Sequence, residues 1–77
     1  MKEQVNKILL TIKPTSKDFL GITDIVEGGY LDSFELMALI SALVDTFGVE
    51  IDVDEIVPEN FNSVEAIVAM IERLKTV

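Results

Sequence analysis

A chain of 77 residues, 49% of them hydrophobic, is long enough for one hydrophobic core and too apolar for a disordered tail. It contains no cysteine and no histidine, so it lacks disulfides, thiolate nucleophiles and the commonest general base and metal ligand, and catalysis by the chain alone is disfavoured. Fourteen acidic against six basic side chains give a formal net charge of −8, which repels the phosphates of nucleic acids and anionic lipid surfaces.

The same features set the expected location and partners. No apolar run approaches the roughly 18 residues of a membrane span, and the N-terminus lacks the continuous apolar segment of a signal peptide. We therefore expect a single domain over residues 1–77, monomeric and cytoplasmic, that binds no nucleic acid and spans no membrane. The negative charge suits encounters with basic patches on other proteins, or it merely keeps the domain soluble; composition alone leaves both readings open.

The first predicted element is a helix from about Lys2 to Ile12. Its apolar residues recur at the spacing i, i+3, i+4, i+7, which places them on one helical face: Val5, Ile8, Leu9 and Ile12. Pro14 ends this helix, because the residue before a proline is pushed out of the helical region and the ring cannot continue the hydrogen-bond ladder.

From Pro14 to Asp32 the irregular pattern predicts a long loop. Its apolar residues are scattered among Gly21, Gly28 and Gly29, and we expect them to hold the loop against the core: Phe19, Leu20, Ile22, Ile25 and Val26. Loops of this length without secondary structure are uncommon in compact domains and are often functional.

The stretch from Leu31 to Glu35 opens the central predicted helix. Its apolar face is wide and follows the helical period: Leu36, Met37, Ile40, Leu43, Val44 and Phe47. Gly48 marks the end, because glycine readily takes the left-handed conformation just past the last turn, and Val49 is placed for the apolar contact that often accompanies such caps.

Two elements are predicted after the central helix. One short helix fits between Glu50 and Phe61, with Pro58 breaking the segment. The final helix is expected to begin with Asn62 as its N-cap and Glu65 completing a capping box, and its apolar face is Val64, Ile67, Val68, Ile71 and Leu74. The predicted fold is all-α: a bundle of three main helices and one short helix, with a long first loop.

Ser33 is the candidate functional residue. If Asp32 is the N-cap of the central helix and Glu35 reaches back to it, the Ser33 hydroxyl is left free to face solvent. The first helical turn favours negative charge by about 0.3–1 kcal/mol at an exposed position, although Asp32 and Glu35 would oppose a phosphate ester there. The site permits phosphodiester chemistry without demanding it, and by this pattern alone Ser33 is interpreted as an ordinary capping or first-turn serine.

Asp32-Ser33-Phe34, at the head of an apolar helix, resembles the Asp-Ser-Leu prosthetic-group motif of acyl carrier proteins. The segment Glu27-Gly28-Gly29-Tyr30-Leu31 resembles the acidic and glycine-containing lead-in of that family, and Phe61-Asn62-Ser63-Val64 resembles the start of its last helix. The likeness covers essentially the whole chain and implies the four-helix bundle of acyl carrier proteins.

The resemblance also implies a cofactor and partners. A phosphopantetheinyl transferase would move a 4′-phosphopantetheine arm from coenzyme A onto Ser33, flanked by Asp32 and Phe34, and the arm's thiol would hold an acyl or aminoacyl group as a thioester. Further partners would be an adenylating enzyme that loads the arm and downstream acyl transferases or synthases. Because the cofactor carries the reactive atom, a chain without cysteine or histidine can take part in acyl transfer.

Two features depart from the family pattern. Phe34 stands where leucine is usual, and the exposed side of the central helix, acidic in fatty-acid carriers, offers only Glu35 and Asp45, with Ala38, Ser41 and Ala42 between them. We expect partners to bind through Glu35, Ala38, Ser41 and Asp45, relying more on shape and apolar contact than on charge, as in peptidyl carrier domains and the D-alanyl carrier protein. For Glu35 and Asp45 the alternative is a solvated helix face.

Several other interpretations are weighed against this one. An unmodified acidic helical adaptor is the main rival, and an enzyme in its own right is disfavoured. The acidic stretch Asp52–Glu55 fails as a calcium loop, because Ile56 and Val57 stand where an oxygen ligand and a glycine are needed. Met37 and Met70 are expected in the core. A minority possibility is that apolar residues of the central and last helices line a cavity for an acyl chain.

Overall fold

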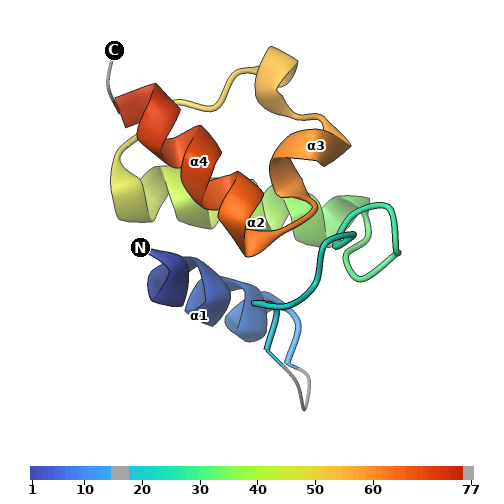
Figure 1. Ribbon diagram of the computed structural model, residues 1–77. Helices are drawn as coiled ribbons and strands as arrows, with labels where there is room; N and C mark the ends of the chain where they lie inside the picture. Colours follow the sequence, from blue (N-terminus) through green and yellow to red (C-terminus); the bar gives the residue numbers. More distant parts are fainter. Residues whose placement is uncertain (15–17, 76–77) are drawn as a thin grey trace.

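A computed structural model describes residues 1–14 and 18–75 and shows a helical bundle (Figure 1). The described residues form four α-helices and one 3₁₀ helix, and they contain no strand: α1 (Lys2–Ile12), α2 (Ser33–Phe47), the 3₁₀ helix η1 (Val53–Glu55), α3 (Pro58–Phe61) and α4 (Val64–Lys75). Helix α1 packs against α2 and α4, and α3 packs against α4. The all-α fold expected from the sequence is confirmed.

Helix α1 has the predicted bounds. Val5 and Leu9 are fully buried, while Ile8 and Ile12 border the core. The N–H of Lys13, the residue that caps the helix at its C-terminus, donates to the carbonyl of Leu9 at 2.8 Å. Residues 15–17 of the predicted loop lie outside the described residues.

One hydrophobic core joins the helices to the loop. The loop contributes Phe19, Ile25 and Leu31, each at most 5% exposed. Of the five loop residues expected against the core, Phe19 and Ile25 are buried and Ile22 and Val26 pack against it, whereas the expectation for Leu20 was wrong, because its side chain is 42% exposed. The remaining core residues come from the helices and from the turn after α2: Val5, Leu9, Leu39, Ile40, Leu43, Val49, Phe61, Val64, Ile67, Met70 and Ile71. No polar or charged residue in the described part of the chain is buried.

Helix α2 ends as predicted and buries most of the predicted apolar face, to which Leu39 is added and from which Met37 is missing. Gly48 adopts the left-handed conformation at φ 67°, and Val49 is buried beside it. The buried residues of α2 are Leu39, Ile40 and Leu43, whereas the Met37 side chain is 55% exposed. Met37 lies about 160° around the helix from Leu39, at 100° per residue, so the expectation of Met37 in the core was wrong. Met70 is buried as expected.

The segment between α2 and α4 holds two short helices where the sequence predicted one. Pro58 does not break a helix but begins α3, at the first helical position, where the missing N–H costs no intrahelical hydrogen bond. Helix η1 is tied to α4 by Arg73, whose Nη1 and Nη2 donate to the Glu55 carboxylate at 3.0 and 2.7 Å. Asn60 Nδ2 donates to the Glu55 carbonyl at 2.8 Å.

The Glu55–Arg73 pair shifts the ionisation of both side chains. The hydrogen bond from Arg73, opposed by partial desolvation and aided by the charge of Arg73, lowers the pKa of the Glu55 carboxyl below its ordinary value. The hydrogen bond to Glu55 raises the pKa of the Arg73 guanidinium. Both groups are therefore charged over a wider pH range than usual.

The predicted N-cap of α4 was wrong. Ser63 Oγ accepts a hydrogen bond from the N–H of Ala66 at 3.0 Å, so Ser63 takes the N-cap role. The third helical position is then Ala66, and Glu65 cannot complete a capping box. Asn62 is instead the C-terminal cap of α3, and its side chain turns toward the loop that precedes α2.

Candidate functional site

Ser33 is the first residue of α2 and is exposed. A capping box surrounds it: Asp32 Oδ1 accepts from the N–H of Glu35 at 2.7 Å, and Glu35 Oε1 accepts from the N–H of Asp32 at 3.0 Å. The predicted Asp32 cap is confirmed. Because Asp32 supplies the capping oxygen, the Ser33 hydroxyl forms no hydrogen bond within the described residues.

The backbone of this turn favours an anion. The N–H groups of Glu35 and Leu36 donate to the side chain and the carbonyl of Asp32, respectively, whereas those of Ser33 and Phe34 form no hydrogen bond among the residues that the structure describes. Unpaired N–H groups at a helix N-terminus carry partial positive charge and attract negatively charged groups. A phosphodiester on Ser33 would therefore lie beside two free donors.

One cation reaches this turn from α1. Lys13 Nζ lies 3.5 Å from Glu35 Oε2, so Glu35 uses one carboxylate oxygen in the capping box and the other in an ion pair. The sequence analysis missed Lys13, because its contact with Glu35 joins two helices far apart in the chain. The only signal was its place directly after the last apolar residue of α1.

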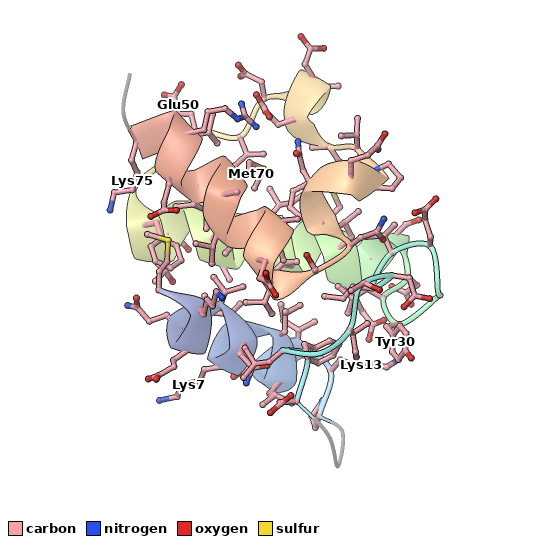
Figure 2. The ribbon with its side chains drawn as sticks, in the orientation of Figure 1. Lys7, Lys13, Tyr30, Glu50, Met70 and Lys75 are labelled. Carbon is pink, nitrogen blue, oxygen red and sulfur yellow. The ribbon has the colours of Figure 1, made fainter. Side chains whose placement is uncertain are left out.

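Exposed apolar side chains lie next to Ser33 in the chain. Phe34 is 85% exposed, and Met37, one helical turn further on, is 55% exposed. Tyr30, in the lead-in to α2, is 42% exposed (Figure 2). Large apolar side chains this exposed are available for contact with another molecule.

The four residues predicted to bind partners do not share one environment. Ala38, Ser41 and Asp45 are exposed and follow one another at helical spacing, so they form a stripe along α2 that starts near Phe34. Glu35 is only partly exposed and is engaged within the chain. Glu35 is therefore placed to organise the start of α2.

Asn62 fixes the loop that leads to Ser33. Its Oδ1 accepts from the N–H groups of Val26 and Glu27 at 3.0 and 3.1 Å, and its Nδ2 donates to Glu27 Oε1 at 2.7 Å. Its carbonyl accepts from the N–H of Ile25 at 2.8 Å. We call this set of hydrogen bonds the Asn62 clasp. It joins the loop to the junction of α3 and α4.

The lead-in turn requires its glycines. A Cβ on Gly28 would lie 2.6 Å from the carbonyl oxygen of Asp24, too close for any other residue without a shift, and Gly29 has φ 77°. The N–H of Tyr30 then donates to the carbonyl of Ile25 at 3.0 Å. The turn brings the chain back to the core at Leu31, directly before the cap of α2 (Figure 1).

A depression beside α2 and α4 lies away from Ser33. It has a volume of about 590 Å³ and is lined by Phe47, Gly48, Val49, Glu50, Asp52, Leu74 and Lys75. Figure 2 labels Glu50 and Lys75 at this end of the molecule, opposite Lys13 and Tyr30. Since Phe47 is about 21 Å along α2 from Ser33, at 1.5 Å per residue, shelter for an acyl chain stays a prediction.

Two further features are absent from the described residues. No group of three or more acidic side chains there is arranged to hold a metal ion. No helix in residues 1–14 or 18–75 is long and apolar enough to cross a membrane.

The chain matches a known protein family. A family model described as a phosphopantetheine attachment site matches residues 16–71, a span that contains most of the loop before α2, all of α2 and most of α4. No curated protein matches the chain. The family match covers well over half of the chain, and the free serine hydroxyl beside a capped helix start fits the covalent group that the family carries. The chain therefore belongs to the acyl and peptidyl carrier protein family, whose members contain an attachment site for a covalent 4′-phosphopantetheine group.

Proposed function

We propose that Ser33 is the residue of this carrier protein that receives the 4′-phosphopantetheine arm. One observation supports this most strongly: Asp32 caps α2, which leaves the Ser33 hydroxyl exposed and without a hydrogen bond among the described residues. Two other serines are described within the matched span. Ser63 uses its hydroxyl as the cap of α4, and Ser41 lies in the middle of α2, away from the free N–H groups.

The chemistry asked of Ser33 is a phosphoryl substitution. A bond forms between Ser33 Oγ and a phosphorus of the coenzyme A pyrophosphate, the phosphorus–oxygen bond to the nucleotide breaks, and adenosine 3′,5′-bisphosphate leaves. The hydroxyl proton passes to a base of the transferase. Once attached, the arm supplies a terminal thiol that holds acyl or aminoacyl groups as thioesters. The residues of the chain present the arm and do not act on the thioester.

Partner enzymes would meet the carrier along α2. Phe34 and Met37 offer exposed apolar contacts, and the stripe of Ala38, Ser41 and Asp45 continues them. A surface with few charges favours recognition by shape and apolar contact. This supports a specialised carrier that an adenylating enzyme loads, of the peptidyl or D-alanyl kind, over a fatty-acid carrier. Its expected partners are a phosphopantetheinyl transferase, that adenylating enzyme, and acyl transferases or synthases.

Intact mass tests the proposal. After incubation with coenzyme A and a phosphopantetheinyl transferase, the unaltered protein should gain roughly 340 Da, the mass that the arm adds by its chemistry. Ser33→Ala should show no gain, and the matched control Ser63→Ala, outside the proposed docking surface, should gain as the unaltered protein does. No gain in the unaltered protein, under conditions that load a known carrier, would favour the unmodified adaptor instead. A cytoplasmic location and a monomeric state remain predictions.

A further inference from the structure

The first turn of α2 collects negative charge. Asp32 and Glu35 bring two carboxylates to it, and the proposed phosphodiester on Ser33 would add a third negative charge within one helical turn. Like charges this close repel, and the free N–H groups of Ser33 and Phe34 offset only part of the repulsion, because they carry partial charge. A full positive charge near this turn would stabilise the loaded form.

Lys13 is placed to supply that charge. Its backbone is held at the end of α1 by the hydrogen bond from its N–H to the Leu9 carbonyl, at 2.8 Å, so the side chain starts from a fixed position. The ammonium lies 3.5 Å from Glu35 Oε2, and the Lys13 side chain is 45% exposed. The distance between Lys13 Nζ and Glu35 Oε2 is longer than the 2.7 Å between Arg73 Nη2 and Glu55 Oε1. A flexible, partly exposed lysine can take a second anionic partner at little cost.

Three other cations of the described residues are less suited. Arg73 is bound to Glu55 through both terminal nitrogens. Lys75 lines the depression at the opposite end of α2, and Lys7 lines a groove between α1 and α2 at Thr46 (Figure 2). Thr46 is near the C-terminus of α2, so both lysines lie several turns of that helix away from Ser33.

We infer that Lys13 is the counter-ion of the phosphodiester on Ser33. In the unmodified protein its ammonium pairs with Glu35; after attachment of the arm it lies between the Glu35 carboxylate and the phosphodiester oxygens. The inference rests on the proposed attachment at Ser33. Its consequence is that the root of the arm is drawn toward the C-terminal end of α1, and that attachment of the arm destabilises the fold less than the added charge alone would.

A thermodynamic cycle tests the inference. The thermal midpoints of unmodified and arm-bearing protein are measured for the unaltered chain, for Lys13→Gln and for the matched control Lys7→Gln. Because each variant is compared with its own unmodified form, the loss of the Lys13–Glu35 pair cancels. Attachment should lower the midpoint of Lys13→Gln by about 2–4 °C more than that of the unaltered chain or of Lys7→Gln.

Salt and a conservative variant sharpen the cycle. In about 1 M salt, where the screening length is about 3 Å, the excess lowering in Lys13→Gln should shrink, and Lys13→Arg should behave as the unaltered chain does. Equal changes in Lys13→Gln and Lys7→Gln, with the arm attached in both, would overturn the role of Lys13 and leave the attachment at Ser33 standing. Absence of the mass gain in the unaltered chain would overturn both proposals.

Discussion

Two helices of this protein start with the same kind of sequence and use it in opposite ways. Asp32-Ser33-Phe34-Glu35 opens α2, and Asn62-Ser63-Val64-Glu65 opens α4. At α2 the Asp32 side chain caps the helix and the Ser33 hydroxyl is free; at α4 the Ser63 hydroxyl is the cap, and the Asn62 side chain binds the loop. A serine is thus available for chemistry only when its neighbour takes the capping role.

Tertiary contacts decide which residue caps. Asn62 is held by the N–H groups of Val26 and Glu27 and by its place at the end of α3, so its oxygen is not available to α4. Asp32 meets no such competitor and forms both hydrogen bonds of a capping box with Glu35. The loop that Asn62 holds is the same loop that leads to Ser33, so the Asn62 side chain stabilises the approach to α2 while Ser63 caps α4.

The largest expected effect separates the two serines. Ser33→Ala should abolish attachment of the arm and change the free energy of unfolding by less than about 0.5 kcal/mol, because the Ser33 hydroxyl forms no hydrogen bond with the residues that the structure describes. Ser63→Ala should leave attachment intact and cost about 1 kcal/mol, because α4 loses its cap. Intact mass and urea denaturation of both variants provide the check. Equal loading of the two variants would refute the distinction between the serines.

Removal of the Asn62 clasp is expected to have the second-largest effect. Asn62→Ala should lower the free energy of unfolding by about 1–2 kcal/mol, because the N–H groups of Val26 and Glu27 lose their acceptor. Hydrogen exchange at these two amides should speed up, while exchange in the middle of α2 changes much less. Asn60→Ala is the control, since it loses a hydrogen bond near η1 and not in the loop. Unchanged exchange at Val26 in Asn62→Ala would mean that the loop is held by its apolar contacts alone.

A smaller effect is expected at the cap of α2. Asp32→Ala should cost about 1 kcal/mol, whereas Asp32→Asn should cost less than about half of that, because asparagine caps helices about as well as aspartate. Urea denaturation of the two variants measures both values. If they prove equally destabilised, the charge of Asp32, and not its capping oxygen, is what stabilises the start of α2.

Much of this arrangement follows from local pattern. The bounds of α1 and the left-handed Gly48 at the end of α2 follow from apolar periodicity and one glycine, and the capping box at Asp32 follows from residue types three positions apart. The free Ser33 hydroxyl was predictable for the same reason. Interactions within one or two helical turns are encoded by neighbouring residues.

The remaining features depend on contacts between distant segments. Asn62 has the right chemistry for an N-cap and lost that role to loop amides 35 and 36 residues away in the sequence. Lys13 and Glu35 meet only because α1 packs against α2. Met37 follows the apolar period of α2 but is exposed, whereas Leu39 is buried. Only the position of the core shows which of the two is buried. Spacing along the chain carries no signal for such pairings.

The smallest expected effect concerns the ion pair between Glu55 and Arg73, which ties η1 to α4. Since the folded state lowers the pKa of Glu55, the unfolded state binds more protons, and the pair stabilises the fold above the ordinary glutamate pKa of about 4.3. That stabilisation is lost as the pH falls through the lowered pKa. Glu55→Gln should therefore be less stable than the unaltered chain at pH 7, with a difference that shrinks below about pH 4. Urea denaturation across this range measures it, and a difference independent of pH would argue against the ion pair.

Tandem mass spectrometry of the protein purified from its native cells tests most directly whether Ser33 carries the arm. We expect a phosphopantetheine group on the peptide that contains Ser33, with Ser41 and Ser63 unmodified. An arm on another residue, or a bare Ser33 in cells where the protein is active, would contradict the proposed attachment.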